Sequence, residues 1–89
     1  MKRFSDEEVN SAKSELAKVR KEWSRRPGVT ALDIGYKVTG GQLKDELAIR
    51  VHVKRKRSLE ELSEDEVFPS RLGRFAVDVI EAEYEPQSP

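Results

Sequence analysis

Residues 46–54 read ELAIRVHVK, and this segment decides the fold. Every second side chain in it is a large apolar one: Leu47, Ile49, Val51 and Val53. The side chains between them are small, charged or polar: Ala48, Arg50, His52 and Lys54. A period of two is typical of a β-strand that buries one face and leaves the other in water. We therefore expect a strand over residues 46–54, with its apolar face on the core.

The segment before it has the same alternation and predicts a partner strand. Residues 30–38 alternate in the same way, and Gly40-Gly41 lies between the two segments. Two glycines supply the positive φ angles that a tight reversal needs, so we expect an antiparallel hairpin, with residues 42–45 in its loop or strand edge. We assign Gly35 to the same turn chemistry, because the glycine spacing matches neither a dinucleotide fingerprint nor a P-loop.

An amphipathic helix is predicted over residues 6–24. Ser5 with Glu8 three residues later forms a capping box, and Pro27-Gly28 ends the segment. Apolar residues recur at spacings of three and four: Val9, Ala12, Leu16, Val19 and Trp23. This stripe fits a face packed on a sheet, and its heptad spacing also fits a coiled-coil seam, although it spans fewer than three full heptads.

The C-terminal part predicts a short helix from Ser58 through Leu62 and a third strand over residues 74–84. Apolar residues on both faces of that strand indicate a central position or a bulge near Asp78, and its direction stays open. The fold class is therefore α+β: an N-terminal helix on a small three-stranded sheet, in the order α-β-β-short α-β. We expect one domain over residues 1–85 and a disordered tail over residues 86–89. The expected core residues are Leu16, Trp23, Ile34, Tyr36, Ile49, Val51, Val53, Val77 and Val79.

Composition limits the class of protein. The chain has 89 residues, no cysteine and 38% charged residues. Cysteine-based zinc sites, disulfides and thiolate nucleophiles are therefore excluded, and no cofactor or metal is expected. The sequence contains neither a long apolar run nor the apolar stretch of a signal peptide, so we expect a cytoplasmic protein without a membrane partner.

The charges divide the sequence into two parts. Residues 1–57 contain 15 Lys and Arg against 8 acids, a net of +7, whereas residues 58–89 contain 2 against 9, a net of −7. This distribution favours oriented contacts with a protein partner or with a second copy of the chain, as in a homodimer. The residues expected to make these contacts are Arg50, His52, Lys54, Arg55, Lys56 and Arg57 on the basic side and Glu60, Glu61 and Glu64 on the acidic side.

Two other function classes stay open. The basic patch at residues 50–57 could bind the phosphates of a nucleic acid, although no aromatic side chain lies within residues 54–57 to stack on bases. The single histidine, His52, could act as a base in a small hydrolase if Asp33 or Asp78 shares its sheet face. No nucleophile motif accompanies it, so we predict that the chain is not an enzyme, and an unchanged activity in His52→Ala would remove the hydrolase alternative.

Short motifs resemble those of a known bacterial module. They are Arg26-Pro27-Gly28-Val29, Ile34-Gly35-Tyr36-Lys37, the strand at residues 47–54, Phe68-Pro69 with Gly73, and Val77-Asp78-Val79-Ile80. Over about residues 26–81 the chain resembles the short module found ahead of trypsin-like serine peptidase domains, and of some nuclease domains, in multidomain bacterial proteins. That family usually has a second glycine where Leu32-Asp33 stands. The resemblance implies an accessory or regulatory module without catalytic residues of its own, which docks on a partner through a sheet edge.

Overall fold

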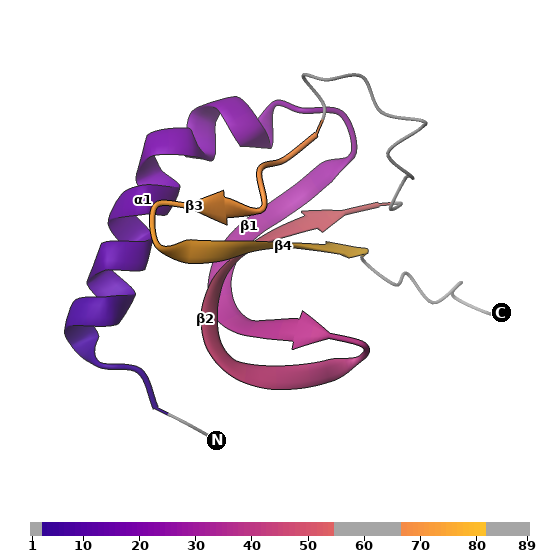
Figure 1. Ribbon diagram of the computed structural model, residues 1–89. Helices are drawn as coiled ribbons and strands as arrows, with labels where there is room; N and C mark the ends of the chain where they lie inside the picture. Colours follow the sequence, from indigo (N-terminus) through magenta and orange to yellow (C-terminus); the bar gives the residue numbers. More distant parts are fainter. Residues whose placement is uncertain (1–2, 55–66, 82–89) are drawn as a thin grey trace, which may run out of the picture.

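The computed structural model describes residues 3–54 and 67–81. Helix α1 (Asp6–Ser24) lies against a sheet of four strands, which are β1 (Val29–Thr39), β2 (Gln42–Val53), β3 (Arg71–Leu72) and β4 (Phe75–Glu81) (Figure 1). The strand order across the sheet is β1-β2-β4-β3. The α+β class is confirmed, with one more strand than the sequence predicts.

Helix α1 has the predicted bounds because both of its ends are defined by local chemistry. The Ser5 side chain accepts a hydrogen bond from the Glu8 backbone N–H, and the Glu8 side chain accepts one from the Ser5 backbone N–H. This capping box satisfies two amide groups that have no partner within the helix. The stripe predicted from the sequence faces the sheet, since Ala12, Leu16 and Trp23 are buried. It is a core face in this structure.

The sheet is mixed. β1 and β2 pair antiparallel as the predicted hairpin, with Gly40 and Gly41 at φ angles of 57° and 78°. β4 runs parallel to β2, and the two-residue strand β3 pairs antiparallel with β4. The sequence left the direction of this strand open, and the structure shows that it is parallel to β2. β4 lies between β2 and β3, and this central position agrees with its apolar residues on both faces.

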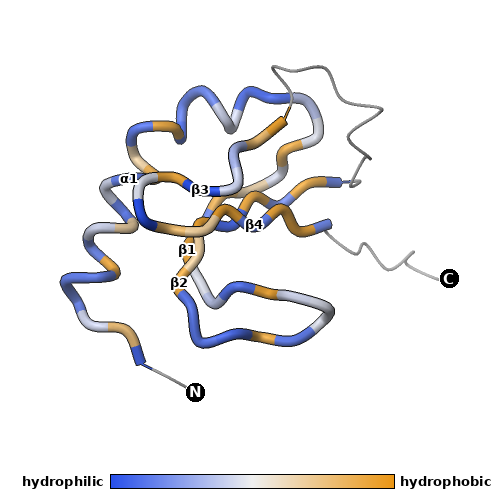
Figure 2. The backbone as a smooth tube through the Cα atoms, in the orientation of Figure 1, coloured by the Kyte–Doolittle hydropathy of each residue, from blue (hydrophilic) through white to orange (hydrophobic). Residues whose placement is uncertain are grey.

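The hairpin bends away from α1. Its far end lies on the side of the sheet opposite the helix (Figure 1), and this end is mostly hydrophilic (Figure 2). The register of β1 shifts between Tyr36 and Val38, and such bulges bend a strand and increase its local twist. The Val38 amide donates a 2.7 Å hydrogen bond to Oδ2 of Asp78 on β4, which ties the bent part of β1 to the sheet.

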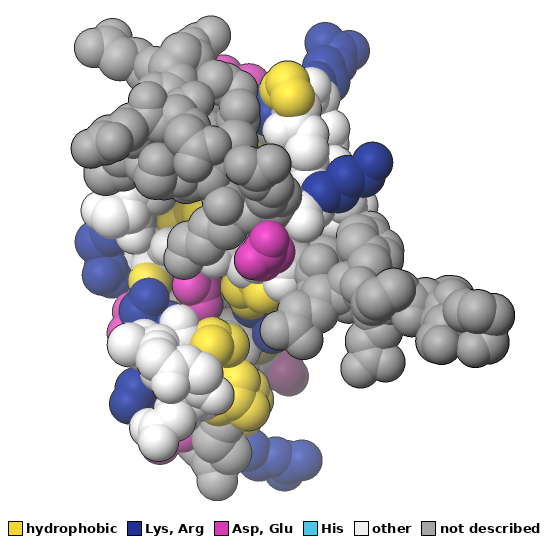
Figure 3. Space-filling model, turned by 90° about the vertical axis from the view of Figure 1, so that its right-hand side faces the viewer, with side chains coloured by type: hydrophobic (Ala, Val, Ile, Leu, Met, Phe, Trp, Pro, Cys, Tyr) yellow, Lys and Arg dark blue, Asp and Glu magenta, His cyan; other side chains and the backbone are white. Residues whose placement is uncertain are grey.

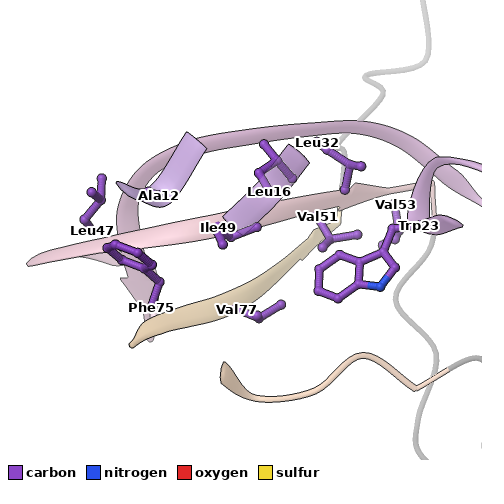
Figure 4. Close-up of a cluster of buried hydrophobic side chains, with 10 residues drawn as sticks. All are labelled: Ala12, Leu16, Trp23, Leu32, Leu47, Ile49, Val51, Val53, Phe75 and Val77. Carbon is purple, nitrogen blue, oxygen red and sulfur yellow. The ribbon is translucent and has the colours of Figure 1, made fainter. Parts of the chain in front are cut away.

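The core lies between α1 and the sheet (Figure 4). Leu16 and Trp23 of the helix are each 2% exposed, and Ile49 and Val51 of β2 are fully buried. Burial of large aliphatic side chains contributes about 1.5–3 kcal/mol each, so this layer accounts for much of the stability. The buried cluster consists of Ala12, Leu16, Trp23, Leu32, Leu47, Ile49, Val51, Val53, Phe75 and Val77.

Three of the predicted core residues lie at the margin of this cluster. Ile34 and Val79 are partly buried and pack against it, whereas Tyr36 packs its ring 5.0 Å from that of Phe4, between ring centroids. Alternation along a strand identifies the apolar face but not how far the helix extends over it. Leu32, Leu47 and Phe75 are buried in their place, within the same cluster.

Residues 67–69 lead into the last two strands, and aromatic contacts hold them at the end of α1. The rings of Trp23 and Phe68 lie edge to face with centroids 5.0 Å apart. The Arg26 guanidinium lies 4.7 Å from the Phe68 ring centroid and donates a 3.4 Å hydrogen bond to the carbonyl of Val67. These contacts fix where the chain returns to the sheet after residues 55–66.

The structure corrects several sequence-based predictions, and others concern residues outside the described ranges. Strand β3 was missed because its two residues are too short for a periodic pattern. Residues 42–45 belong to β2, and β4 begins at Phe75, one residue later than predicted. Gly35 is not a turn glycine, because it lies within β1 and lacks a positive φ. The predicted short helix from Ser58, the end of the third strand after Glu81, and the tail 86–89 lie outside the described residues.

Candidate functional site

The predicted basic patch is not a continuous cationic surface in the part that the structure describes. Arg50 and His52 lie on the face of β2 that points away from α1, and Lys54 is exposed just after the strand. The Lys54 amide donates a 2.9 Å hydrogen bond to the Gly28 carbonyl, which places this lysine beside the start of β1. The remaining predicted contact residues lie outside the described ranges: Arg55, Lys56, Arg57, Glu60, Glu61 and Glu64.

Arg50 is held by a carboxylate on the neighbouring strand. Asp33 of β1 stands opposite Arg50 in the β1–β2 register. The guanidinium donates two hydrogen bonds to it, from Nε to Oδ1 at 2.8 Å and from Nη2 to Oδ2 at 2.9 Å. Asp78 stands opposite Arg50 on the other side, in β4. A bidentate pair fixes the orientation of the guanidinium, so Arg50 is not free to follow a phosphate backbone.

Gly35 makes room for this arrangement. A Cβ atom on Gly35 would lie 2.5 Å from Cζ of Arg50 and 2.8 Å from its Nε. Carbon atoms do not approach so closely without a shift. The glycine therefore gives the guanidinium its place over β1, next to Asp33, and we interpret it as a close-approach glycine rather than a hinge or turn.

The electrostatics of the pair follow from this geometry. Burial raises the pKa of Asp33, but the hydrogen bonds from Arg50 and the proximity of His52 outweigh it, and the pKa lies below its ordinary value. The hydrogen bonds to Asp33 raise the pKa of Arg50 in turn, against the opposing effect of burial, and attraction to Asp78 adds to it. Both partners are charged at neutral pH.

His52 shares this face, as the sequence suggested, together with Asp33 and Asp78. Its Nε2 atom is buried and lies 3.1 Å from Oδ1 of Asp33, in an orientation that forms no hydrogen bond. Since Asp33 already accepts two hydrogen bonds from Arg50, its carboxylate is occupied by the guanidinium rather than dedicated to the imidazole. Within residues 3–54 and 67–81, no group of three or more His, Cys, Asp or Glu side chains could hold a metal ion.

Figure 3 views the molecule from the side opposite α1 in Figure 1, and residues that the structure does not describe cover much of this view. Among the coloured side chains, Lys and Arg, Asp and Glu, and hydrophobic residues all appear, with several Lys and Arg at the outline. The described side chains seen from this side are therefore of mixed charge. A nucleic-acid surface would need clustered cations that are free to contact phosphates.

A different feature lies along the β1 edge of the sheet. β1 ends the strand order, so one side of its backbone has no neighbouring strand among the described elements. A groove of ≈ 210 Å³ runs between this edge and the C-terminal half of α1. It is lined by Arg20 and Ser24 of the helix and by Val29, Thr30, Ala31 and Leu32. This site was not predicted from the sequence. The alternation of residues 30–38 predicts a strand but does not show that the strand lies at the edge of the sheet.

A second depression lies near the start of α1. It is lined by Phe4, Glu8, Asp45, Glu46, Leu47, Arg71, Arg74 and Phe75. Its cations and carboxylates neutralise one another in part, since Arg71 Nη1 lies 4.0 Å from Oε2 of Glu46. Such exposed pairs contribute little to stability, and the three carboxylates and two arginines of the lining leave a net charge of only −1.

No protein-family model matches this chain, and no curated protein is significantly similar to it. The described part of the chain contains no helix that is long and apolar enough to cross a membrane.

Proposed function

We propose that this chain is a non-catalytic accessory module that acts by protein contact, including contact between its own copies, and that β1 is its docking edge. The observation that carries the proposal is the position of β1 at the end of the strand order, beside a groove that α1 completes. Strand-adding modules use such an edge, where backbone hydrogen bonds supply affinity and side-chain pockets supply selectivity.

The length of the edge supports this use. β1 has 11 residues, and its pairing with β2 is regular between Ala31 and Tyr36, with register shifts on either side. Bulges blunt an edge against uncontrolled pairing, and the regular part between them is long enough for one short added strand. By contrast, the strand at the other end of the sheet, β3, has two residues.

The nucleic-acid alternative receives less support. It depends on residues 50–57, and of these Arg50 is already paired with Asp33 through two hydrogen bonds of 2.8 and 2.9 Å. Releasing the guanidinium to a phosphate would leave a half-buried carboxylate without its partner, which costs energy. We therefore place protein contact first.

We also propose that the chain is related to the accessory module that precedes trypsin-like serine peptidase domains in bacterial proteins. The motifs that carry this resemblance lie at structural positions: Gly35 beside Arg50, Phe68 against Trp23, and Asp78 at the Val38 amide. A role as an accessory part of a larger assembly fits a domain in which β1 forms an edge of the described sheet.

Light scattering on a size-exclusion column tests the proposal, at low and moderate salt and with a mixed-sequence oligonucleotide present or absent. A defined oligomer that ignores the oligonucleotide supports a protein-contact module. A monomer that comigrates with the oligonucleotide at low salt and releases it as salt rises would overturn the proposal in favour of the basic patch.

A further inference from the structure

The groove beside β1 carries charge of one sign. Helical spacing places Lys13, Arg20 and Ser24 on the flank of α1 that faces β1, since they are seven and four residues apart. The opposite flank carries carboxylates: Glu8 lines the same depression as Phe75, and the Glu15 carboxylate would lie 3.1 Å from a Cβ on Gly73. The helix is therefore basic toward the open sheet edge and acidic toward β3 and β4.

Within residues 3–54 and 67–81, the cation of the groove, Arg20, has no ion-pair partner. Among the described residues, no carboxylate forms an ion pair with Arg20 or Lys13. The carboxylate of β1, Asp33, lies on the other face of the sheet and is taken by Arg50. A strand added to β1 would point alternate side chains toward α1, where Arg20 is the charged group that lines the groove.

The sequence contains a segment whose charge pattern matches this requirement. Residues 81–85 read EAEYE, with an acid at every second position, and the first of them, Glu81, is the last residue of β4. Alternate acids in an extended segment would all face one side, as the groove requires. This segment belongs to the part of the chain with a net charge of −7, whereas the groove belongs to the part with +7.

We infer that the groove between α1 and β1 binds the acidic segment 81–85 of a second copy of this chain, which adds to β1 as a strand and places its acids toward Arg20. This inference rests on the proposed function and names its partner. The contact is reciprocal in a closed pair, because each copy contributes one groove and one acidic segment.

Charge-reversal variants of the full chain test the inference by sedimentation equilibrium at low salt. Arg20→Glu weakens the dimer, and so does the double substitution Glu83→Lys with Glu85→Lys. A symmetric pair contains the contact twice, so each reversal should raise the dimer dissociation constant by up to about tenfold, given the energies of exposed ion pairs. All three reversals combined in one chain restore the opposite charges and bring the constant back toward the wild-type value.

The matched control is Lys44→Glu. It makes the same charge change on an exposed residue of β2 near the hairpin turn, away from the groove. This variant should dimerise as the wild type does. Urea unfolding followed by Trp23 fluorescence confirms that each variant is folded, which is expected because Arg20 and Lys44 are exposed.

Three results would overturn the inference. A wild-type chain that stays monomeric at millimolar concentration has no second-copy contact to explain. A dimer that survives Arg20→Glu and the tail reversals uses another surface, and the proposed function would stand without this partner. The third result is a monomer in which Glu83→Lys with Glu85→Lys shifts the NMR amide resonances of Ser24 and of residues 30–32. In that case the acidic segment binds the groove of its own copy.

Discussion

The close approach of Gly35 and Arg50 predicts a reversal of sign in a double-mutant cycle. Gly35 lacks a positive φ, so alanine can adopt the same backbone. In the wild-type background, however, the new Cβ would lie 2.5 Å from Cζ of Arg50 and must displace the guanidinium from Asp33. In the Arg50→Ala background the three atoms nearest to the new Cβ, all of the Arg50 guanidinium, are gone. The same substitution should therefore destabilise the first protein and stabilise the second.

The magnitude follows from two opposing effects. The side chains of Arg50 and Asp33 are 25% and 44% exposed, so loss of their bidentate pair should cost about 1 kcal/mol, at the upper end for partly exposed pairs. Replacing glycine by alanine at a compatible position stabilises by about 0.5 kcal/mol, because the unfolded chain has less freedom. Gly35→Ala should thus cost about 0.5 kcal/mol in the wild type and contribute about 0.5 kcal/mol in Arg50→Ala.

Equilibrium unfolding in urea, followed by Trp23 fluorescence, measures this difference. Trp23 is the single tryptophan and is 2% exposed, so it reports on the core. With a slope of about 1 kcal/mol per molar urea for a domain of this size, Gly35→Ala should lower the urea midpoint by about 0.5 M in the wild type and raise it by about 0.5 M in Arg50→Ala.

The double-mutant cycle can also show that Gly35 does not act through Arg50. If Gly35→Ala changes the free energy of unfolding equally in both backgrounds, the glycine does not act by accommodating Arg50. The close-approach interpretation of β1 would then be wrong.

Three further predictions follow from other contacts. Asp33 has a lowered folded-state pKa, so its contribution is present above the unfolded pKa of about 3.9 and is lost as pH falls through the folded value. The wild type should therefore exceed Asp33→Asn in stability at pH 7 and lose that advantage near pH 2, as urea unfolding at both pH values shows. Asp78→Ala removes the acceptor of the 2.7 Å hydrogen bond from Val38, which should cost about 1–2 kcal/mol and speed exchange of the Val38 amide, whereas Asp78→Asn keeps an acceptor and should cost less. Ser5→Ala removes the N-cap of α1 and should cost about 1 kcal/mol in the same assay, and no loss would contradict the capping box.

The elements that follow from local patterns were predictable from the sequence. Helix α1 has its predicted bounds because Ser5 and Glu8 mark its start, and the hairpin follows from two alternating segments around Gly40-Gly41. The buried face of β2 follows from the period of ELAIRVHVK. Each of these predictions depends only on residues close together in the chain.

The candidate site was not predictable in the same way, because it depends on which strands become neighbours. The sequence assigns Arg50 to a basic contact patch, but it does not show that pairing with β1 and β4 brings Asp33 and Asp78 opposite this residue. The same topology leaves β1 as the edge and gives Arg20 its groove. Charge counted along the sequence does not show which charges are neutralised across the sheet.

The most direct test of a docking edge on β1 is amide hydrogen exchange, measured residue by residue in the associated and dissociated chain. If β1 is the docking edge, association slows exchange most within β1 between Ala31 and Tyr36, with smaller effects at Ser24 of α1. Protection confined to the opposite face, around Arg50, His52 and Lys54, with β1 unchanged, would contradict it.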